Sequence, residues 1–222
     1  MVEIEIIEYL LELIYPNICG ICEQIDKNSL CENCKLELEK DIIGRIDNYD
    51  KNASKFFNKH GYIFKYSGQI RKLLIDYKFN NKAYMYKTFS QIIVNNSNII
   101  NFIKDYEIII PIPIHRKRFN NRGYNQSELL AKEICKYLKN TNFRNDILVK
   151  IKNNTAQSTL NKAERVLNVK DAYKIKNNNF TKEKRILLID DIYTTGNTVN
   201  ECSRVLKEYG AKEIGVLTIS KD

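Results

Sequence analysis

Two adjacent carboxylates, Asp190 and Asp191, precede a short turn rich in hydroxyl groups at 194–198. The apolar run before them, 186–189, is typical of a strand buried on both faces of a parallel sheet. The acids would therefore lie at the carboxyl end of a strand, which is the edge where open α/β sheets bind ligands. The turn leads into an amphipathic pattern, and backbone N–H groups at the start of a helix can bind a phosphate. The arrangement predicts a site for a sugar phosphate whose hydroxyls meet the two acids.

Each half of this pattern also has a less specific interpretation. An aspartate at a strand end often only caps the next turn, and Thr-Gly is common in loops. The order of strand, acid pair, turn and helix is what makes the pattern specific. Neither G-x-x-x-x-G-K-[ST] nor G-x-G-x-x-G, two other phosphate-binding motifs, occurs in the sequence. The expected phosphate contacts are the five residues of the turn: Thr194, Thr195, Gly196, Asn197 and Thr198.

Positive charge is concentrated between residues 115 and 124, shortly after a predicted buried strand at 106–110. This segment would lie on the same sheet edge as the acids, where the planar guanidinium of arginine suits a pyrophosphate group. Two alternatives stay open, a solvated basic loop and a contact with nucleic acid. His115 would either donate a proton or form a local hydrogen bond. The segment contains no acid and four cations: Arg116, Lys117, Arg118 and Arg122.

Four of the six cysteines form two C-x-x-C pairs, namely Cys19, Cys22, Cys31 and Cys34. Each short turn brings two thiolates to one metal, and four thiolates complete a tetrahedral zinc site. Such a zinc would be structural, because no coordination position remains for a substrate. The alternative is a pair of redox-active dithiols. Cys135 and Cys202 are isolated and are expected to be packing residues.

Length and charge limit the class of protein. A chain of 222 residues has room for one α/β domain and a small appendage, and a formal charge of +9 favours polyanionic partners. A generally lysine-rich surface would explain part of this charge. The first fifteen residues carry four glutamates, unlike a signal peptide, and no stretch approaches the roughly 20 apolar residues of a membrane span. We therefore expect a soluble, cytoplasmic protein without membrane insertion.

The remaining elements follow from apolar periodicity. Residues 2–14 predict a short helix, 41–60 a polar connector and 62–66 an edge strand. Tyrosines alternate with lysines at 82–87, where they would either stack unpaired bases or be half-buried helix residues. The other elements, in chain order, are expected at 67–78 (helix), 82–95 (helix), 125–138 (helix), 147–151 (strand), 152–159 (mobile loop), 162–168 (helix) and 214–219 (strand).

Several motifs spread over almost the whole chain point to one family. Besides the cysteine pairs and the turn at 194–198, they are Tyr-Ser-Gly-Gln-Ile-Arg-Lys-Leu-Leu at 66–74 with Lys78 downstream, Pro-Ile-Pro-Ile-His-Arg-Lys-Arg at 111–118, Arg-Gly-Tyr-Asn-Gln at 122–126, and the block Lys152, Thr155, Gln157, Leu160, Arg165 and Asn168. Together these motifs resemble the ComF family of competence proteins.

The resemblance implies the fold and the site. It implies a type I phosphoribosyltransferase fold, a parallel sheet flanked by helices, at 46–222, preceded by an N-terminal helix and a zinc knuckle at 1–45. The ligand would be phosphoribosyl pyrophosphate (PRPP) with Mg²⁺. Asp190 and Asp191 would hold ribose hydroxyls and help place Mg²⁺, and the turn at 194–198 would bind the 5′-phosphate. Pyrophosphate would face Ile112, Pro113, Ile114, His115 and Arg116, and the catalytic residues would be Asp190, Asp191 and Arg116.

The resemblance also implies a role in natural transformation, in which imported single-stranded DNA enters the cytoplasm. The expected partners are single-stranded DNA and other competence or DNA-processing proteins, with DNA contacts at Lys117, Arg118 and Arg122. Two alternatives stay open, a phosphoribosyltransferase in nucleobase salvage and a PRPP-sensing regulator. No helix-turn-helix pattern supports the regulator. A nucleobase-binding hood cannot be assigned beyond the N-terminal region, so the sequence does not identify an acceptor.

Overall fold

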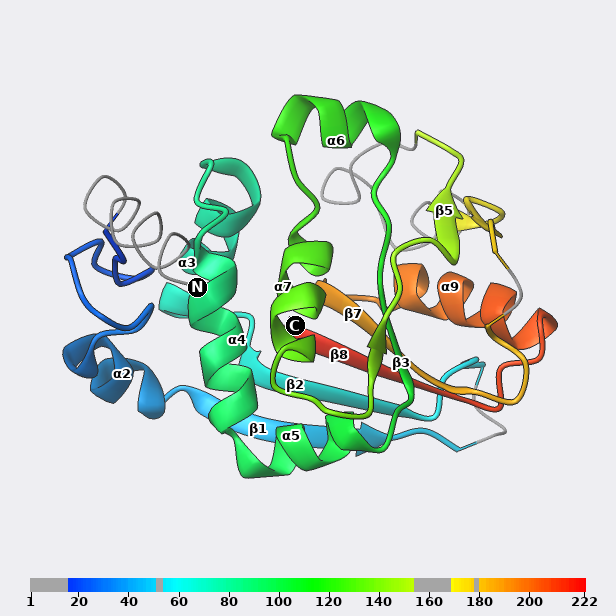
Figure 1. Ribbon diagram of the computed structural model, residues 1–222, viewed down its shortest axis with the longest axis horizontal. Coiled ribbons are helices and arrows are strands. Elements are labelled where there is room, and N and C mark those ends of the chain that lie inside the picture. The colour runs from blue at the N-terminus through cyan, green and yellow to red at the C-terminus, as the bar shows by residue number, and fades with distance from the viewer. Residues whose placement is uncertain (1–15, 51–53, 154–168, 178–179) are drawn as a thin grey trace, which may run out of the picture.

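The computed structural model describes residues 16–50, 54–153, 169–177 and 180–222. Its centre is a six-stranded sheet (Figure 1). β1 runs antiparallel to β2, and the other neighbouring strands are parallel. A small second sheet pairs β5 (Leu148–Lys150) with β6 (Tyr173–Ile175) in antiparallel fashion. Across the large sheet the order is β1 (Ile42–Asn48), β2 (Lys59–Lys65), β8 (Glu213–Lys221), β7 (Arg185–Tyr193), β3 (Ile108–Pro111) and β4 (Asn142–Phe143).

Helices cover both faces of the large sheet. In β7, Leu187 and Ile189 belong to one hydrophobic cluster, whereas Ile186 and Leu188 belong to another. The separation arises because successive residues of a strand point to opposite faces. The second cluster includes residues of α9 (Asn197–Glu208) and of the β5–β6 sheet. The first cluster includes residues of four helices: α3 (Gly68–Phe79), α4 (Met85–Asn95), α5 (Ser97–Lys104) and α7 (Gln126–Cys135).

Two further helices lie at the periphery of the molecule in Figure 1. α2 (Glu32–Glu39), at the lower left, follows the cysteine pairs and adds Leu38 to the first cluster. α6 (Arg116–Arg122) lies at the top of the view and has no buried residue. It ends at Gly123, whose φ of 81° is the left-handed conformation that glycine adopts at helix ends. α6 therefore has no side chain buried in the core, and the residues that flank it determine its position.

Most of the elements expected from periodicity are confirmed. The predicted helices at 67–78, 82–95 and 125–138 correspond to α3, α4 and α7. Asn125 caps α7, because its side chain accepts a hydrogen bond from the backbone N–H of Ser127. The predicted strands correspond to β3, β5, β7 and β8, and the helix after the hydroxyl-rich turn is α9. The strand–helix–strand unit that carries the acid pair is therefore present as predicted.

The sequence interpretation of 41–60 as a polar connector is wrong, because this segment contains β1 and the start of β2. β2 is not an edge strand either, since it lies between β1 and β8. β1 shows poor apolar alternation because its pairing with β2 shifts register between Ile42 and Arg45. α5 was also missed. β1 consequently adds one antiparallel pair to the predicted parallel sheet.

Some predictions fall on parts of the chain that are not described. The helices at 2–14 and 162–168 lie outside the described residues, as does most of the loop at 152–159. The division between residues 45 and 46 stays a prediction. It falls within β1, and Cys19, Cys31 and Cys34 belong to the same hydrophobic cluster as the sheet.

Within the described ranges, no helix is both long enough and apolar enough to cross a membrane.

The structure predicts a stability change that depends on the buried His60 of β2, whose Nε2 lies 2.8 Å from Thr218 Oγ1. Burial, aided by the nearby Lys221 ammonium, lowers the pKa of His60 to about 3. Below about pH 6.5, this histidine binds a proton in the unfolded chain but not in the folded chain. The free energy of unfolding therefore decreases as the pH falls. We expect His60 to lower the free energy of unfolding by about 2 kcal/mol when the pH falls from 7 to 5.

Urea unfolding of the wild type and of His60→Gln at both pH values would test this prediction. The other titrating groups are shared by the two proteins, so the difference between them isolates His60. An equal loss of unfolding free energy in both proteins would contradict the prediction.

Candidate functional site

A cleft of about 850 Å³ opens at the carboxyl end of the parallel strands. Its lining comes from α3, the segment after β3, α6, the start of α7, the end of β7 and the start of α9. Asp190 and Asp191, the acid pair, both line it. The hydroxyl turn (194–198) also lines the cleft, with the exception of Thr195. The fold therefore brings the acid pair and the predicted phosphate-binding turn together in one cleft.

The two acids have different partners. Lys78 of α3 holds Asp191, with Nζ at 2.9 Å from Oδ2 and 3.0 Å from Oδ1. Asp190 Oδ1 accepts hydrogen bonds from Ser127 Oγ at 3.1 Å and from the backbone N–H of Asp191 at 2.9 Å. Burial raises the pKa of Asp190 to about 7, and the adjacent Asp191 carboxylate adds to the rise. Asp191 is thus already paired, whereas Asp190 lacks a cation and would gain from one.

The hydroxyl turn has features that suit an anion. Gly196 has a φ of 74°, and a Cβ there would lie 2.3 Å from Tyr193 Oη, so the position requires glycine. Among the described residues, the buried Asn197 Nδ2 and Thr195 Oγ1 have no hydrogen-bond partner. Both groups can donate, and the first backbone N–H groups of a helix have no partner within that helix. A phosphate at this turn would satisfy donors that the protein leaves unsatisfied.

The basic segment is divided between the cleft and the surface. It is not a loop, since Arg116–Arg122 forms α6, and His115 caps this helix by accepting the Lys117 backbone N–H on Nδ1 at 3.2 Å. Ile112, Pro113, Ile114, Arg118 and Arg122 line the cleft. His115, Arg116 and Lys117 are not among its lining residues, and Arg116 and Lys117 are exposed. Arg118 and Arg122 of α6 thus line the cleft, whereas Arg116, the predicted pyrophosphate contact, lies outside its lining.

Three further cations line the cleft that were not predicted as site residues from the sequence. Arg71 and Lys78 line the cleft from α3, and Lys150 lines it from β5. Burial lowers the pKa of Lys150, as does the charge of Arg118. The seven-residue spacing of Arg71 and Lys78 on a predicted helix was a usable signal, because residues seven apart share a face. Lys150 offered no such signal.

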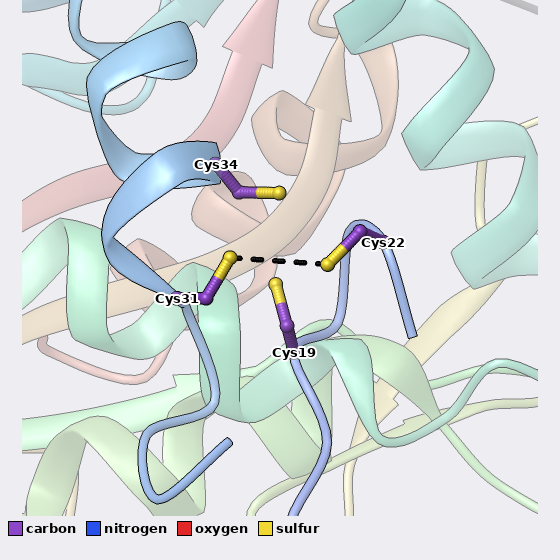
Figure 2. A group of neighbouring side chains, drawn as sticks. All are labelled: Cys19, Cys22, Cys31 and Cys34. Atoms are coloured by element: carbon purple, nitrogen blue, oxygen red, sulfur yellow. Dashed lines mark hydrogen bonds between the residues drawn. The ribbon is translucent and has the colours of Figure 1, made fainter. Parts of the chain in front are cut away.

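The four cysteines of the N-terminal pairs converge on one point (Figure 2). Their sulfur atoms all lie within 4.8 Å of one another, and Cys22 Sγ is 3.8 Å from Cys31 Sγ. Zinc–sulfur bonds of ~2.3 Å in a tetrahedron would place sulfurs ~3.8 Å apart, which this cluster matches. Burial opposes ionisation of Cys19, but backbone N–H groups of Cys31, Cys22 and Ile21 lower its pKa to about 7. Burial instead raises the pKa of Cys34, so the support for a zinc site is the arrangement of the four sulfurs.

The segment that carries these cysteines (19–34) packs directly on α4. Thr88 Oγ1 donates a hydrogen bond to the carbonyl of Ser29, and Ser29 Oγ donates to Gln91 Oε1 at 3.0 Å. Gly20 allows this approach, since a Cβ there would lie 2.2 Å from Thr88 Oγ1. Glu23 forms an ion pair with Lys82, which precedes α4. The cysteine segment is therefore fastened to the main domain rather than flexibly tethered.

Comparisons with known proteins extend over most of the chain. A model of the phosphoribosyl transferase domain matches residues 125–222, which include β7, the hydroxyl turn and α9. Competence protein F of Haemophilus influenzae is 29% identical, covering 95% of this chain and 93% of that protein. Competence protein ComFC of Streptococcus pneumoniae is 31% identical, covering 90% and 79%. DNA utilization protein YhgH of Escherichia coli is 22% identical, covering 93% and 91%. The helix-flanked sheet is therefore a phosphoribosyltransferase fold.

The cysteine cluster predicts one zinc ion per chain. The double variant Cys31→Ser, Cys34→Ser should lose the metal, because two of four thiolate ligands are removed. It should also lose order in the cysteine segment, whose folding is coupled to the metal. Elemental analysis of the purified proteins would measure the zinc content. Cys135→Ser, outside the cluster, is the control and should keep one zinc; stoichiometric zinc in the double variant would refute the assignment.

Proposed function

The chain belongs to the ComFC family of competence proteins, and from this and the cleft we propose that it binds PRPP with Mg²⁺ and handles single-stranded DNA. One observation carries the first part of the proposal. A single cleft joins a turn with unsatisfied donors, an acid pair and several cations. The turn suits a phosphate, the acid pair suits the hydroxyls of a ribose, and the cations suit a pyrophosphate.

We assign the parts of PRPP to residues of the cleft as follows. The 5′-phosphate would bind at the hydroxyl turn, with Asn197 as one donor. The ribose hydroxyls would meet the acid pair. Pyrophosphate would lie against the segment 112–114, with Arg118 and Arg122 neutralising its charge in place of the surface residue Arg116.

Mg²⁺ fits the donor set of the cleft. Asp190 and Asp191 offer carboxylate oxygens, the ligands that Mg²⁺ prefers, and the ion keeps several waters or phosphate oxygens as its other ligands. A cation beside Asp190 would also oppose the rise in its pKa that burial causes. The ion would supply charge neutralisation for the pyrophosphate.

The same residues would support ribosyl transfer to a nucleophile. In that reaction the bond between the anomeric carbon and the pyrophosphate oxygen breaks, and a bond to the nucleophile forms. The carboxylates would favour positive charge developing on the ribose, and the two arginines would stabilise the departing anion.

DNA binding is proposed at the mouth of the cleft. α6 carries four cations and no acid, and Arg116 and Lys117 are exposed on it. Phe79, at the end of α3, is 65% exposed although it lines the cleft, and the Arg122 guanidinium lies 5.4 Å from its ring centre. Exposed aromatic rings among cations bind unpaired bases by stacking. Tyr124 is half-buried and donates its hydroxyl to Tyr77 O.

The names of the relatives support a DNA role for this surface. Two of them are competence proteins and a third is a DNA utilization protein. Zinc would act in this proposal as a structural ion that fixes the cysteine segment on α4. The contacts of that segment with Thr88 and Gln91 support the structural role.

The first test concerns PRPP. The double variant Asp190→Asn, Asp191→Asn should bind Mg–PRPP at least about tenfold more weakly than the wild type, since it lacks the charges that hold Mg²⁺ and ribose. Isothermal titration calorimetry would measure the affinity, and circular dichroism would check the fold. Asp105→Asn, an exposed acid at the far end of α5, is the matched control and should bind normally. Unchanged affinity in the double variant would rule out the acid pair as the site.

The second test concerns DNA. Arg116→Glu with Lys117→Glu should greatly reduce binding of a labelled single-stranded oligonucleotide, measured by fluorescence anisotropy over a salt series. The logarithm of affinity should fall with that of salt by about 0.7 per phosphate neutralised, so the variant should show a smaller slope. Phe79→Ala should reduce the free energy of DNA binding by roughly 1–3 kcal/mol, with little change in the slope of its salt dependence.

Lys104→Glu with Lys139→Glu provides the control, because it makes the same charge change at exposed positions outside the cleft. Neither altered residue of the test variant lines the cleft, so PRPP binding should survive in it. Equal loss of DNA binding in both charge variants would mean that net charge alone, and not this surface, binds DNA.

A further inference from the structure

The segment 54–57 lies against the back of the hydroxyl turn although it is far from it in sequence. Lys55 Nζ donates a hydrogen bond to Tyr193 Oη at 2.7 Å. Asn200, in the first turn of α9, accepts the backbone N–H of Phe56 on Oδ1 at 2.8 Å. Its Nδ2 donates to the carbonyl of Ser54 at 3.2 Å. The segment is therefore attached on both sides of the turn, to the residue before it and to the helix after it.

Tyr193 links this segment to the backbone of the turn. Its hydroxyl lies where a Cβ of Gly196 would stand, only 2.3 Å from that position. The ring is fixed by His60, stacked with centroids 4.2 Å apart, and by Phe57, which meets it edge-on at 6.4 Å. A shift of the Tyr193 hydroxyl would thus be transmitted to Gly196, whose left-handed conformation starts α9.

Lys55 occupies an unusual environment for a lysine. Its ammonium lies between 5.4 and 5.6 Å from the ring centres of Tyr49, Phe57 and Tyr193. Burial lowers its pKa, a desolvation cost that the ring faces and the Tyr193 hydroxyl offset. The sequence analysis treated Lys55 as part of a polar connector, and neither the acid pair nor the cleft lining explains its position.

Lys221 places an ammonium near the Tyr193 ring. Lys221 Nζ lies 5.8 Å from the Tyr193 ring centre and is paired with Asp47 at 2.6 Å. Lys55 adds a second ammonium on the same ring. Lys221 is thus neutralised by Asp47, whereas no ion pair joins Lys55 to an acid among the described residues.

We propose that Lys55 is a positioning residue for the hydroxyl turn and that, through Tyr193, it sets the affinity of this turn for a phosphate monoester. The inference rests on the proposed function, because the phosphate monoester is the 5′-phosphate of PRPP. Lys55 itself does not line the cleft, so it would act through the turn and not by touching the ligand.

Two ligands that share the cleft separate this role from a general effect on folding. Ribose 5-phosphate carries the monoester alone, whereas pyrophosphate would bind on the side of Arg118 and Arg122. Lys55→Met keeps the aliphatic stem but loses the hydrogen bond and the charge. It should weaken ribose 5-phosphate and Mg–PRPP binding by about tenfold in calorimetry, while pyrophosphate affinity stays within about twofold.

Additional variants test the pathway. Tyr193→Phe should weaken ribose 5-phosphate binding, and adding Lys55→Met to it should cause little further loss, since the two residues form one link. Asn200→Ala, which cuts the other attachment, should also weaken ribose 5-phosphate more than pyrophosphate. Lys104→Met removes one exposed charge far from the turn and should leave both affinities unchanged. Melting temperatures of all variants would establish that each is folded.

Three results would overturn the inference. They are wild-type affinity of Lys55→Met for ribose 5-phosphate, an equal loss for pyrophosphate, and full additivity of Lys55→Met with Tyr193→Phe. In any of these cases the binding of PRPP by the wild type would leave the proposed function standing. A wild-type protein that binds neither phosphate ester would overturn the proposed function and this inference together.

Discussion

The ion pair between Lys78 and Asp191 is the interaction on which the cleft depends. It joins the end of α3 to the end of β7, and the Asp191 side chain is only 9% exposed. Breaking such a pair leaves an uncompensated charge, at a typical cost of about 3–5 kcal/mol. The same end of α3 is tied to α7, because Tyr77 Oη donates to the carbonyl of Gln126 at 2.8 Å and Gln126 Nε2 donates to Lys78 O at 3.2 Å. Three segments distant in sequence are thereby held around the acid pair.

This pairing makes two chemically identical side chains unequal. Asp191 has its cation within the protein, whereas Asp190 is contacted by the Ser127 hydroxyl and a backbone N–H and has a raised pKa. A buried carboxyl without a cation tends to hold a proton, and an incoming cation displaces it. The protein thus leaves one of its two acids available to a ligand that brings positive charge. The unsatisfied donors of the hydroxyl turn leave a complementary opening for negative charge.

Local patterns predicted the part of the site that is contiguous in sequence. The acid pair, the turn and α9 follow one another along the chain, and the cysteine pairs need only short turns, so spacing alone was informative. Lys150 reaches the cleft, and Lys55 reaches Tyr193, only through packing, and no local pattern marks either residue. For Lys78 the one local signal was its spacing from Arg71 on the predicted helix. Arg116 lies outside the cleft lining because its segment is a short helix, in which Arg118 and Arg122 are the arginines that line the cleft. β1 was missed because its alternation is broken at Gly44, where φ is 54°.

The strand order has a consequence for the time course of folding. β1 and β2 form one side of the sheet and β3 and β4 the other, and the two sides meet only through β7 and β8. These central strands are synthesised after the other four. Until they emerge, β2 and β3 each present an open edge, the kind of surface that invites pairing with another chain. β7, the strand that carries the acid pair, can cover the edge of β3 as it emerges, whereas the edge of β2 stays open until β8, the last strand, inserts between β7 and β2. A nascent chain therefore acquires the strand of its ligand cleft before it loses its last exposed edge.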